Sequence, residues 1–333
     1  MVRCGGRHSS GLAQDGPGYG ETDVALPAAS VSQPFGVETW VERSRIPLRR
    51  GANAQEQGYA ACESEGCAQR YVCGWQRQRA FYIVQAMAKP LFAINPDLDR
   101  AALAESFARE RRIQIRDVLT RETAEELRAI LANRTDWGVA IHADTGQGEA
   151  PKSFRAHELR APETARGLQE LVRATDKAAA QRHYAFRSLR YSLVEAYLGK
   201  WNEGGPHDLL LEHLNAAPFL DLVRTVTALP ELAKADAHAS CFGPQHFLGR
   251  HIDSHVTEGW RVAYVLNLTI DDWHPDWGGY LVFFDEDGDV ITGYRPRFNT
   301  LNLFLVPQPH AVTFVPPFAP HGRYAVSGWL RDR

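Results

Sequence analysis

The stretch Gly249-Arg250-His251-Ile252-Asp253 decides the fold that we predict for this chain. Its histidine and its aspartate are two residues apart, and side chains alternate between the two faces of a β-strand. An extended segment would therefore place one imidazole nitrogen and one carboxylate oxygen on the same side, where both could bind one metal ion. A third ligand is still needed. His310 is our candidate, because it opens the strand-like run 311–315 after enough sequence for two β-hairpins.

His251, Asp253 and His310 together supply two imidazoles and one carboxylate. This ligand set is the facial triad of non-haem Fe(II) oxygenases, which leaves three adjacent coordination positions open for a co-substrate and dioxygen. A lone histidine in a strand is usually structural, but an ordered set of this kind favours a metal site.

The sequence around these residues consists of short apolar runs separated by turn signals. Segments such as Asp285-Glu286-Asp287-Gly288 mark the turns. Strand-like runs cover residues 261–268, 280–284, 290–294, 301–306, 311–315 and 323–329. Six short strands at this spacing predict an antiparallel sandwich or barrel.

Several motifs in this part of the chain resemble those of the 2-oxoglutarate and Fe(II)-dependent dioxygenases, and within them the prolyl hydroxylase-like branch. In the family's order, they are His251-x-Asp253, Tyr264-x-Leu266-Asn267, Gly278-Gly279-x-Leu281, His310-x-Val312, and Arg323-Tyr324-Ala325 leading to Trp329. The resemblance implies a mainly β fold with flanking helices. Its core would be a double-stranded β-helix, a cupin-like jelly-roll barrel buttressed by N-terminal helices.

The resemblance also implies roles for individual residues. His251, Asp253 and His310 carry over as iron ligands. Arg323 carries over as the salt-bridge partner of the distal carboxylate of 2-oxoglutarate, and Tyr264 as a hydrogen-bond donor to the same carboxylate. We further expect two apolar residues to pack on the co-substrate, although both would equally suit the core: Leu281 and Trp329. The implied cofactors are Fe(II) and 2-oxoglutarate, with ascorbate as a reductant that could support turnover.

The arginine has a physical reason that does not depend on the resemblance. A dicarboxylate that chelates the metal through its 2-oxo acid end leaves its second carboxylate deep in the barrel, and an uncompensated buried charge is costly. A guanidinium can pair with that carboxylate through two parallel hydrogen bonds. Arg323 lies farther from His310 than is usual in the family, and the extra residues form the proline-rich segment 316–320.

Alternatives to these assignments exist within the same sequence. His321 is a rival third ligand; choosing it would move the arginine role to Arg331 and abandon the Arg-Tyr-Ala match. Arg187 and Arg190 could meet a substrate, but exposed arginines are common in strands. We interpret the remaining nearby histidines as rim or surface residues: His246, His255 and His274.

Composition limits the compartment and the partners. The chain has 333 residues, is 44% hydrophobic and carries a net charge of -3, which gives no electrostatic case for nucleic acid or an anionic membrane as partner. Neither a secretory signal nor a transmembrane run is evident, so we expect a cytoplasmic protein.

Residues 1–86 differ from the rest of the chain. They are rich in Gly, Ser, Gln and Arg, lack regular periodicity and hold four of the five cysteines. Cys62, Cys67 and Cys73 have neither the Cys-x2-Cys spacing nor the nearby histidine of a zinc site. We expect a disordered extension, or a reading frame that truly starts at Met87. Residues 87–333 would form the dioxygenase domain, with helical support over 97–235 and the metal-binding barrel over 237–333.

The predicted activity couples oxidative decarboxylation of 2-oxoglutarate to hydroxylation of an unactivated C–H bond, releasing succinate and carbon dioxide. The branch resemblance makes a prolyl residue of a protein or peptide the leading substrate. A free amino acid or another small metabolite is the alternative within the same chemistry. From a different class, the chain could be a jelly-roll module that binds or senses a ligand without turnover. The oligomeric state stays open.

Overall fold

The computed structural model of this chain describes residues 91–253 and 258–333. The predicted extension over residues 1–86, its cysteines, the Met87 start and His255 all lie outside the described residues.

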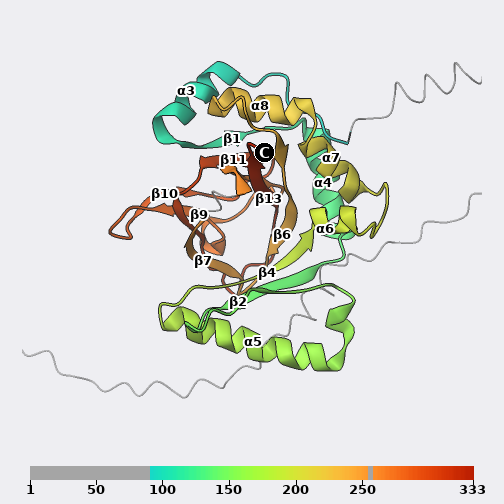
Figure 1. Cartoon of the computed structure of the whole chain (residues 1–333), viewed down its shortest axis with the longest axis vertical. Helices are drawn as coiled ribbons and strands as arrows, with labels where there is room; N and C mark the ends of the chain where they lie inside the picture. The colour runs from blue at the N-terminus through green and yellow to red at the C-terminus, as the bar shows by residue number, and fades with distance from the viewer. Residues whose placement is uncertain (1–90, 254–257) are drawn as a thin grey trace, which may run out of the picture.

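The described chain is built around one antiparallel sheet that curls into a nearly closed barrel (Figure 1). Its main hydrogen-bonded path runs β1-β11-β8-β13-β6-β4-β7-β12-β9-β10, with β2 and β5 pairing beside it on β4 and β13, and β3 on β2. The strands are β1 (Arg112–Arg116), β2 (Gly138–Ala143), β3 (Lys152–Phe154), β4 (Ala185–Ser192), β5 (Lys234–Ala235), β6 (His238–Phe242), β7 (Phe247–Ile252), β8 (Trp260–Asn267), β9 (Leu281–Phe284), β10 (Val290–Tyr294), β11 (Thr300–Leu305), β12 (Pro309–Val312) and β13 (Arg323–Arg331). The prediction of a mainly β, double-stranded β-helix fold is confirmed.

Strand β8 illustrates why these sequences form a barrel with two buried faces. Val262, Tyr264 and Leu266 belong to the large core on the helical side of the sheet, whereas Ala263 packs inside the barrel. A strand that is covered on both faces reads as a continuous apolar run instead of an alternating one. The run of apolar residues in β8 is therefore the signature of a central strand.

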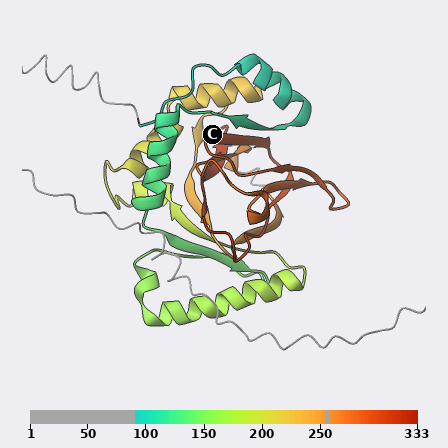
Figure 2. The same cartoon turned by 180° about the vertical axis from the view of Figure 1, so that it is seen from behind.

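The helices cover the outer face of the sheet (Figures 1 and 2). They are α3 (Arg100–Glu110), α4 (Arg121–Asn133), α5 (Pro162–Ala180), α6 (Leu193–Leu198), α7 (Pro206–Leu214) and α8 (Ala217–Thr227), with 3-10 turns η1 (Glu158–Arg160) and η3 (Pro275–Trp277). The N-cap of α3 is Asp99, whose side chain accepts from the amide of Ala102. The six α-helices of the described residues all lie in the segment predicted as helical support, but that segment also supplies β1 to β5.

Two apolar clusters matter for the site. The larger one lies between the helices and the outer face of the sheet, where α8 contributes Phe219, Leu222 and Val226. The smaller one fills part of the barrel interior and consists of Ala263, Leu281, Phe283 and Phe304 with their partly buried neighbours. Part of the barrel interior is therefore a packed apolar core.

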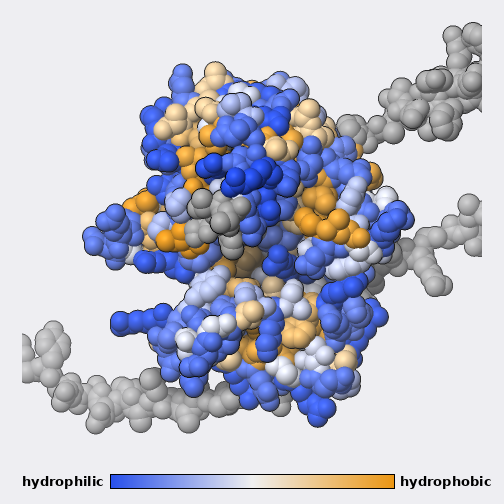
Figure 3. All heavy atoms as spheres, in the orientation of Figure 1, coloured by the Kyte–Doolittle hydropathy of each residue, from blue (hydrophilic) through white to orange (hydrophobic). Residues whose placement is uncertain are grey.

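The visible surface is mainly hydrophilic, with a few apolar patches (Figure 3). One patch lies over α6 and α7, where Tyr197, Leu198 and Leu209 are exposed. Within the described ranges, no helix has the length and apolar character to cross a bilayer.

Candidate metal centre and anion pocket

Pairing of two distant strands brings the predicted metal ligands together. Strand β12 runs antiparallel to β7, with His310 directly opposite His251. Asp253 follows the end of β7, and one potential ligand atom from each of the three residues lies within 4.8 Å of the others. The Nε2 atom of His251 is 3.5 Å from Asp253 Oδ1, and the Nε2 atom of His310 is 3.6 Å from Asp253 Oδ2. The three side chains thus converge on one point.

Backbone carbonyls orient both imidazoles. His251 Nδ1 is 3.0 Å from the carbonyl oxygen of Gly249, and His310 Nδ1 is 2.9 Å from that of Gln308. A carbonyl only accepts hydrogen bonds, so each Nδ1 must carry the proton and donate it. This tautomer leaves the Nε2 lone pair of each ring directed at the convergence point, as a metal ligand requires.

The protonation states also suit a metal. Burial, followed by the nearby His251 ring, lowers the pKa of His310 to about 4, so its imidazole is neutral at neutral pH. Burial by itself would raise the pKa of Asp253, but its polar contacts with His251 and His310 outweigh that effect and hold the pKa below its usual value. A neutral imidazole and an ionised carboxylate are the forms that bind a divalent cation.

Aromatic rings enclose His310. Its ring centroid is 4.8 Å from that of Phe304 and 6.1 Å from that of Phe283. Both phenylalanines belong to the apolar cluster inside the barrel. They limit the access of water to the convergence point from this side.

Arg323 lies buried in the same barrel, with only 2% of its surface exposed. Its Nη2 donates to Asn267 Oδ1 at 3.2 Å, while Nε and Nη1 are buried and have no partner among the described residues. Burial lowers the pKa of the guanidinium to about 10, which still leaves it charged at neutral pH. A buried cation with two unpartnered donors is suited to a carboxylate.

The backbone next to Arg323 includes two consecutive glycines. Gly278 and Gly279 both have positive φ, at 61° and 69°. A Cβ on Gly278 would come within 2.1 Å of the carbonyl oxygen of Phe314, and one on Gly279 would crowd Arg323 Cδ at 3.4 Å. Glycine is the residue that adopts this conformation without strain. The Gly-Gly pair seen in the sequence therefore lets the backbone pass close to the Phe314 carbonyl at Gly278 and close to Arg323 at Gly279.

Residues 237–331 match the family model of the 2OG-Fe(II) oxygenase superfamily. This part of the chain belongs to that superfamily. The match covers the whole of the triad and Arg323. Its donor set of two imidazole nitrogens and one carboxylate oxygen is the set expected for Fe(II) in such oxygenases.

Several solved structures are similar to this chain. A prolyl-4-hydroxylase from Pseudomonas putida is 20% identical, with a TM-score of 0.43, over 72% of this chain and 95% of that one. A Trichoplax adhaerens prolyl hydroxylase, solved with a hypoxia inducible factor peptide fragment, is 15% identical, with a TM-score of 0.45, over 78% and 93%. A 2OG-Fe(II) oxygenase family protein from Burkholderia pseudomallei is 12% identical, with a TM-score of 0.46, over 73% and 94%. Among curated proteins, none matched this chain.

The structure does not bring Tyr264 into the anion pocket. The Tyr264 side chain lies on the outer face of β8, where its hydroxyl donates to the carbonyl oxygen of Asp236 at 2.8 Å. Its ring packs edge-on against Phe219 of α8. Asn267 contacts Arg323 instead. The two positions are three apart along the strand, so their side chains face opposite sides of it; the sequence by itself did not indicate which of the two sides lines the barrel.

The other two predicted co-substrate residues lie inside the barrel. Leu281 is buried in the cluster with Phe283. Trp329 packs against that cluster, and its indole nitrogen donates to Asp253 Oδ2 at 2.9 Å. Trp329 is thus a direct neighbour of a candidate metal ligand, a relationship that the sequence did not suggest.

The rival ligand scheme finds no geometric support. His321 is exposed, contacts the Trp277 ring and does not belong to the group of converging ligands found among the described residues. Arg331 pairs with Asp236 at 2.5 Å, near the end of β13. Arg187 is likewise engaged, because its guanidinium bonds Asp176 of α5 at 2.6 Å.

Proposed function

We propose that this oxygenase uses Fe(II) and 2-oxoglutarate to hydroxylate an unactivated C–H bond. In this proposal His251, Asp253 and His310 hold the metal, and Arg323 binds the distal carboxylate of 2-oxoglutarate. The observation that carries it is the buried Arg323 guanidinium, with two N–H groups that lack partners in the described chain, in the same barrel as the triad. A barrel that only bound a metal would have no use for this charge.

The protein's own contribution is placement and exclusion of water. Carbonyl groups fix the imidazoles, and the Trp329 indole fixes the Asp253 carboxylate. Asn267 holds one edge of the Arg323 guanidinium and leaves the other edge available for a carboxylate. The chemistry supplied by bound Fe(II) is dioxygen activation coupled to oxidative decarboxylation of 2-oxoglutarate to succinate and carbon dioxide.

We further propose that the substrate is a prolyl residue of a protein or peptide. The support is the resemblance of the Tyr264-x-Leu266-Asn267 and Arg323-Tyr324-Ala325 motifs to those of the prolyl hydroxylase-like branch. A free amino acid or small metabolite would use the same metal chemistry.

The test measures both turnover and its product. The full-length chain is incubated with Fe(II), 2-oxoglutarate and ascorbate, and succinate is quantified with host protein extract, synthetic proline-containing peptides or free amino acids as substrates. Mass spectrometry then locates any added oxygen atom. Asp253→Ala is the control without a metal ligand.

We expect substrate-stimulated succinate release that Asp253→Ala abolishes, and an added oxygen on a prolyl residue. Oxygen found only on a free amino acid would replace the prolyl proposal while keeping the chemistry. Equal succinate release by wild type and Asp253→Ala would contradict the ligand assignment itself.

A further inference from the structure

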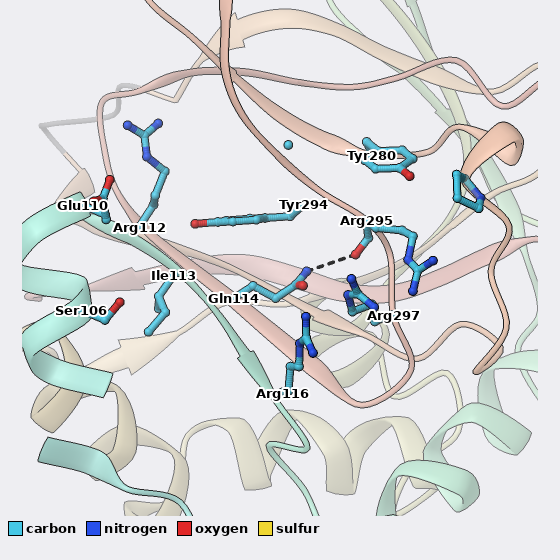
Figure 4. A pocket seen from close by; sticks show the side chains of 12 residues that line it. Ser106, Glu110, Arg112, Ile113, Gln114, Arg116, Tyr280, Tyr294, Arg295 and Arg297 are labelled. Atoms are coloured by element: carbon cyan, nitrogen blue, oxygen red, sulfur yellow. Dashed lines mark hydrogen bonds between the residues drawn. The ribbon is translucent and has the colours of Figure 1, made fainter. Parts of the chain in front are cut away.

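A second cavity of about 600 Å³ lies at the seam of the barrel (Figure 4). Strands β1 and β10 are the two ends of the main strand path, and both line this cavity, as do α3 and the segment that links β10 to β11. We call this place the seam, because the two end strands of the curled sheet both reach it but do not pair with each other as neighbouring strands do.

The cavity is lined by four arginines: Arg112, Arg116, Arg295 and Arg297. Figure 4 shows Arg116, Arg295 and Arg297 gathered at one end and Arg112 at the other, with Tyr294 between them. The only carboxylate in the lining belongs to Glu110, and among the described residues no ion pair joins an acidic group to any of the four. The whole chain has a net charge of -3, so this cluster is a local feature.

The guanidinium groups keep donors that nothing satisfies within the described ranges. The Nε atoms of Arg112, Arg295 and Arg297 are buried and have no hydrogen-bond partner there. Burial, followed by the charges of Arg295 and Arg116, lowers the pKa of Arg297. Buried donors of this kind are rare in native proteins, and each one calls for an explanation. Here three of them lie around one cavity.

This cavity is separate from the metal centre. The Arg112 guanidinium carbon lies 4.9 Å from the centre of the Phe283 ring. The same ring is a neighbour of the candidate metal ligand His310, with ring centroids 6.1 Å apart. Phe304 packs edge-on against Phe283, with ring centroids 5.0 Å apart, so the two rings together form an apolar layer. Neither the triad residues nor Arg323 belong to the residues that line the seam cavity.

We propose that the seam cavity binds a small anion that carries at least two negative charges on phosphate or carboxylate groups. Clustered like charges in a concave, partly desolvated site attract a counter-ion strongly. The planar guanidinium fork matches the oxygen spacing of both phosphate and carboxylate. An anion held between β1 and β10 would also link the two ends of the sheet, so its binding should stabilise the fold.

The test uses inorganic phosphate and, separately, malonate as probes of the two anion chemistries. Binding to the full-length chain is measured by isothermal titration calorimetry and by the shift in melting temperature, with sodium chloride at matched ionic strength as the reference. The variants are Arg116→Gln, Arg297→Gln and their double. Arg166→Gln, an exposed arginine on α5, is the matched control, and Arg323→Lys separates this cavity from the pocket inside the barrel.

We expect at least one probe to raise the melting temperature beyond the chloride reference. Each of the two seam substitutions should weaken binding roughly tenfold, since each removes charge-assisted hydrogen bonds. Arg166→Gln should bind like wild type, and Arg323→Lys should keep the binding that Arg116→Gln and Arg297→Gln weaken. If neither probe exceeds the chloride reference, or if the double variant retains wild-type affinity, the proposal is overturned. Loss of binding in Arg323→Lys alone would also overturn it, by placing the anion in the barrel pocket.

Discussion

The indole nitrogen of Trp329 donates a hydrogen bond of 2.9 Å to Oδ2 of Asp253. The two residues are brought together across the barrel from β13 and from the end of β7. The Trp329 ring stacks on Trp260 with centroids 3.9 Å apart and planes 10° from parallel, so the donor is held in position. Trp329 therefore acts on the carboxylate that we propose as a metal ligand.

Trp329→Phe should weaken metal binding while preserving the fold. Phenylalanine keeps an aromatic ring for Trp260 but cannot donate to Asp253, and loss of a group that orients a ligand typically costs about 10- to 100-fold in metal affinity. The measurement is anaerobic titration of Fe(II), or of Mn(II) as a stand-in. Trp137→Phe removes an indole bond to the carbonyl of Leu131 on the helical side and serves as control. Equal metal affinity in both variants would show that the Asp253 contact is dispensable.

Arg323→Lys should raise the Michaelis constant for 2-oxoglutarate at least tenfold, and Arg323→Ala about thirty-fold or more. Removing the partner of a desolvated charge typically costs about 2 to 5 kcal/mol, and lysine keeps the charge but not the fork. Metal affinity should stay at the wild-type value, because Arg323 is not a member of the triad. His321→Ala should change neither quantity. Metal loss in His321→Ala with a 2-oxoglutarate defect in Arg331→Ala would instead establish the rival scheme.

Tyr264→Phe should leave the Michaelis constant for 2-oxoglutarate unchanged. The hydroxyl bonds the Asp236 carbonyl on the outer face of β8, so its loss should lower the free energy of unfolding by about 1 kcal/mol without touching the pocket. Chemical denaturation and steady-state kinetics on the same preparation measure both effects. A raised Michaelis constant with unchanged stability would support Tyr264 as a hydrogen-bond donor to the distal carboxylate of 2-oxoglutarate.

Stability should fall as the pH drops below about 6.5, in part through His207. This residue is 4% exposed, and burial followed by the charge of Arg134 lowers its pKa below the ordinary value of 6.5. The unfolded chain therefore binds this proton more readily than the folded chain. Above the unfolded pKa of about 6.5, the neutral ring makes its full contribution to the free energy of unfolding. This contribution is lost as the pH falls towards the folded pKa, at no more than about 1.4 kcal/mol per pH unit.

Comparison of wild type with His207→Gln isolates this effect, because other titrating groups are common to both proteins. Urea unfolding at pH 7.5 and at pH 5.5 should show the stability difference between them shrinking at the lower pH. A difference that is independent of pH would mean that His207 titrates alike in the folded and unfolded states.

The sequence by itself determined those features that follow from local pattern. The two-residue spacing in His251-x-Asp253, the strand-opening His310 and the apolar runs between turn signals predicted the ligand set and the barrel, and the structure brings those ligands together. The Arg-Tyr-Ala motif identified Arg323, whose burial next to two positive-φ glycines fits the predicted carboxylate partner.

Only the tertiary structure decided what lies on which side of each strand and which distant residues meet. Tyr264 and Asn267 are both in β8, but whether an odd or an even position faces the barrel depends on pairing with β11 and β13, which no local pattern fixes. The Trp329 bond to Asp253 and the arginines at the seam arise in the same way. Arg112 and Arg297 are far apart in sequence, and they share a cavity because the curl of the sheet brings its first strand to its last.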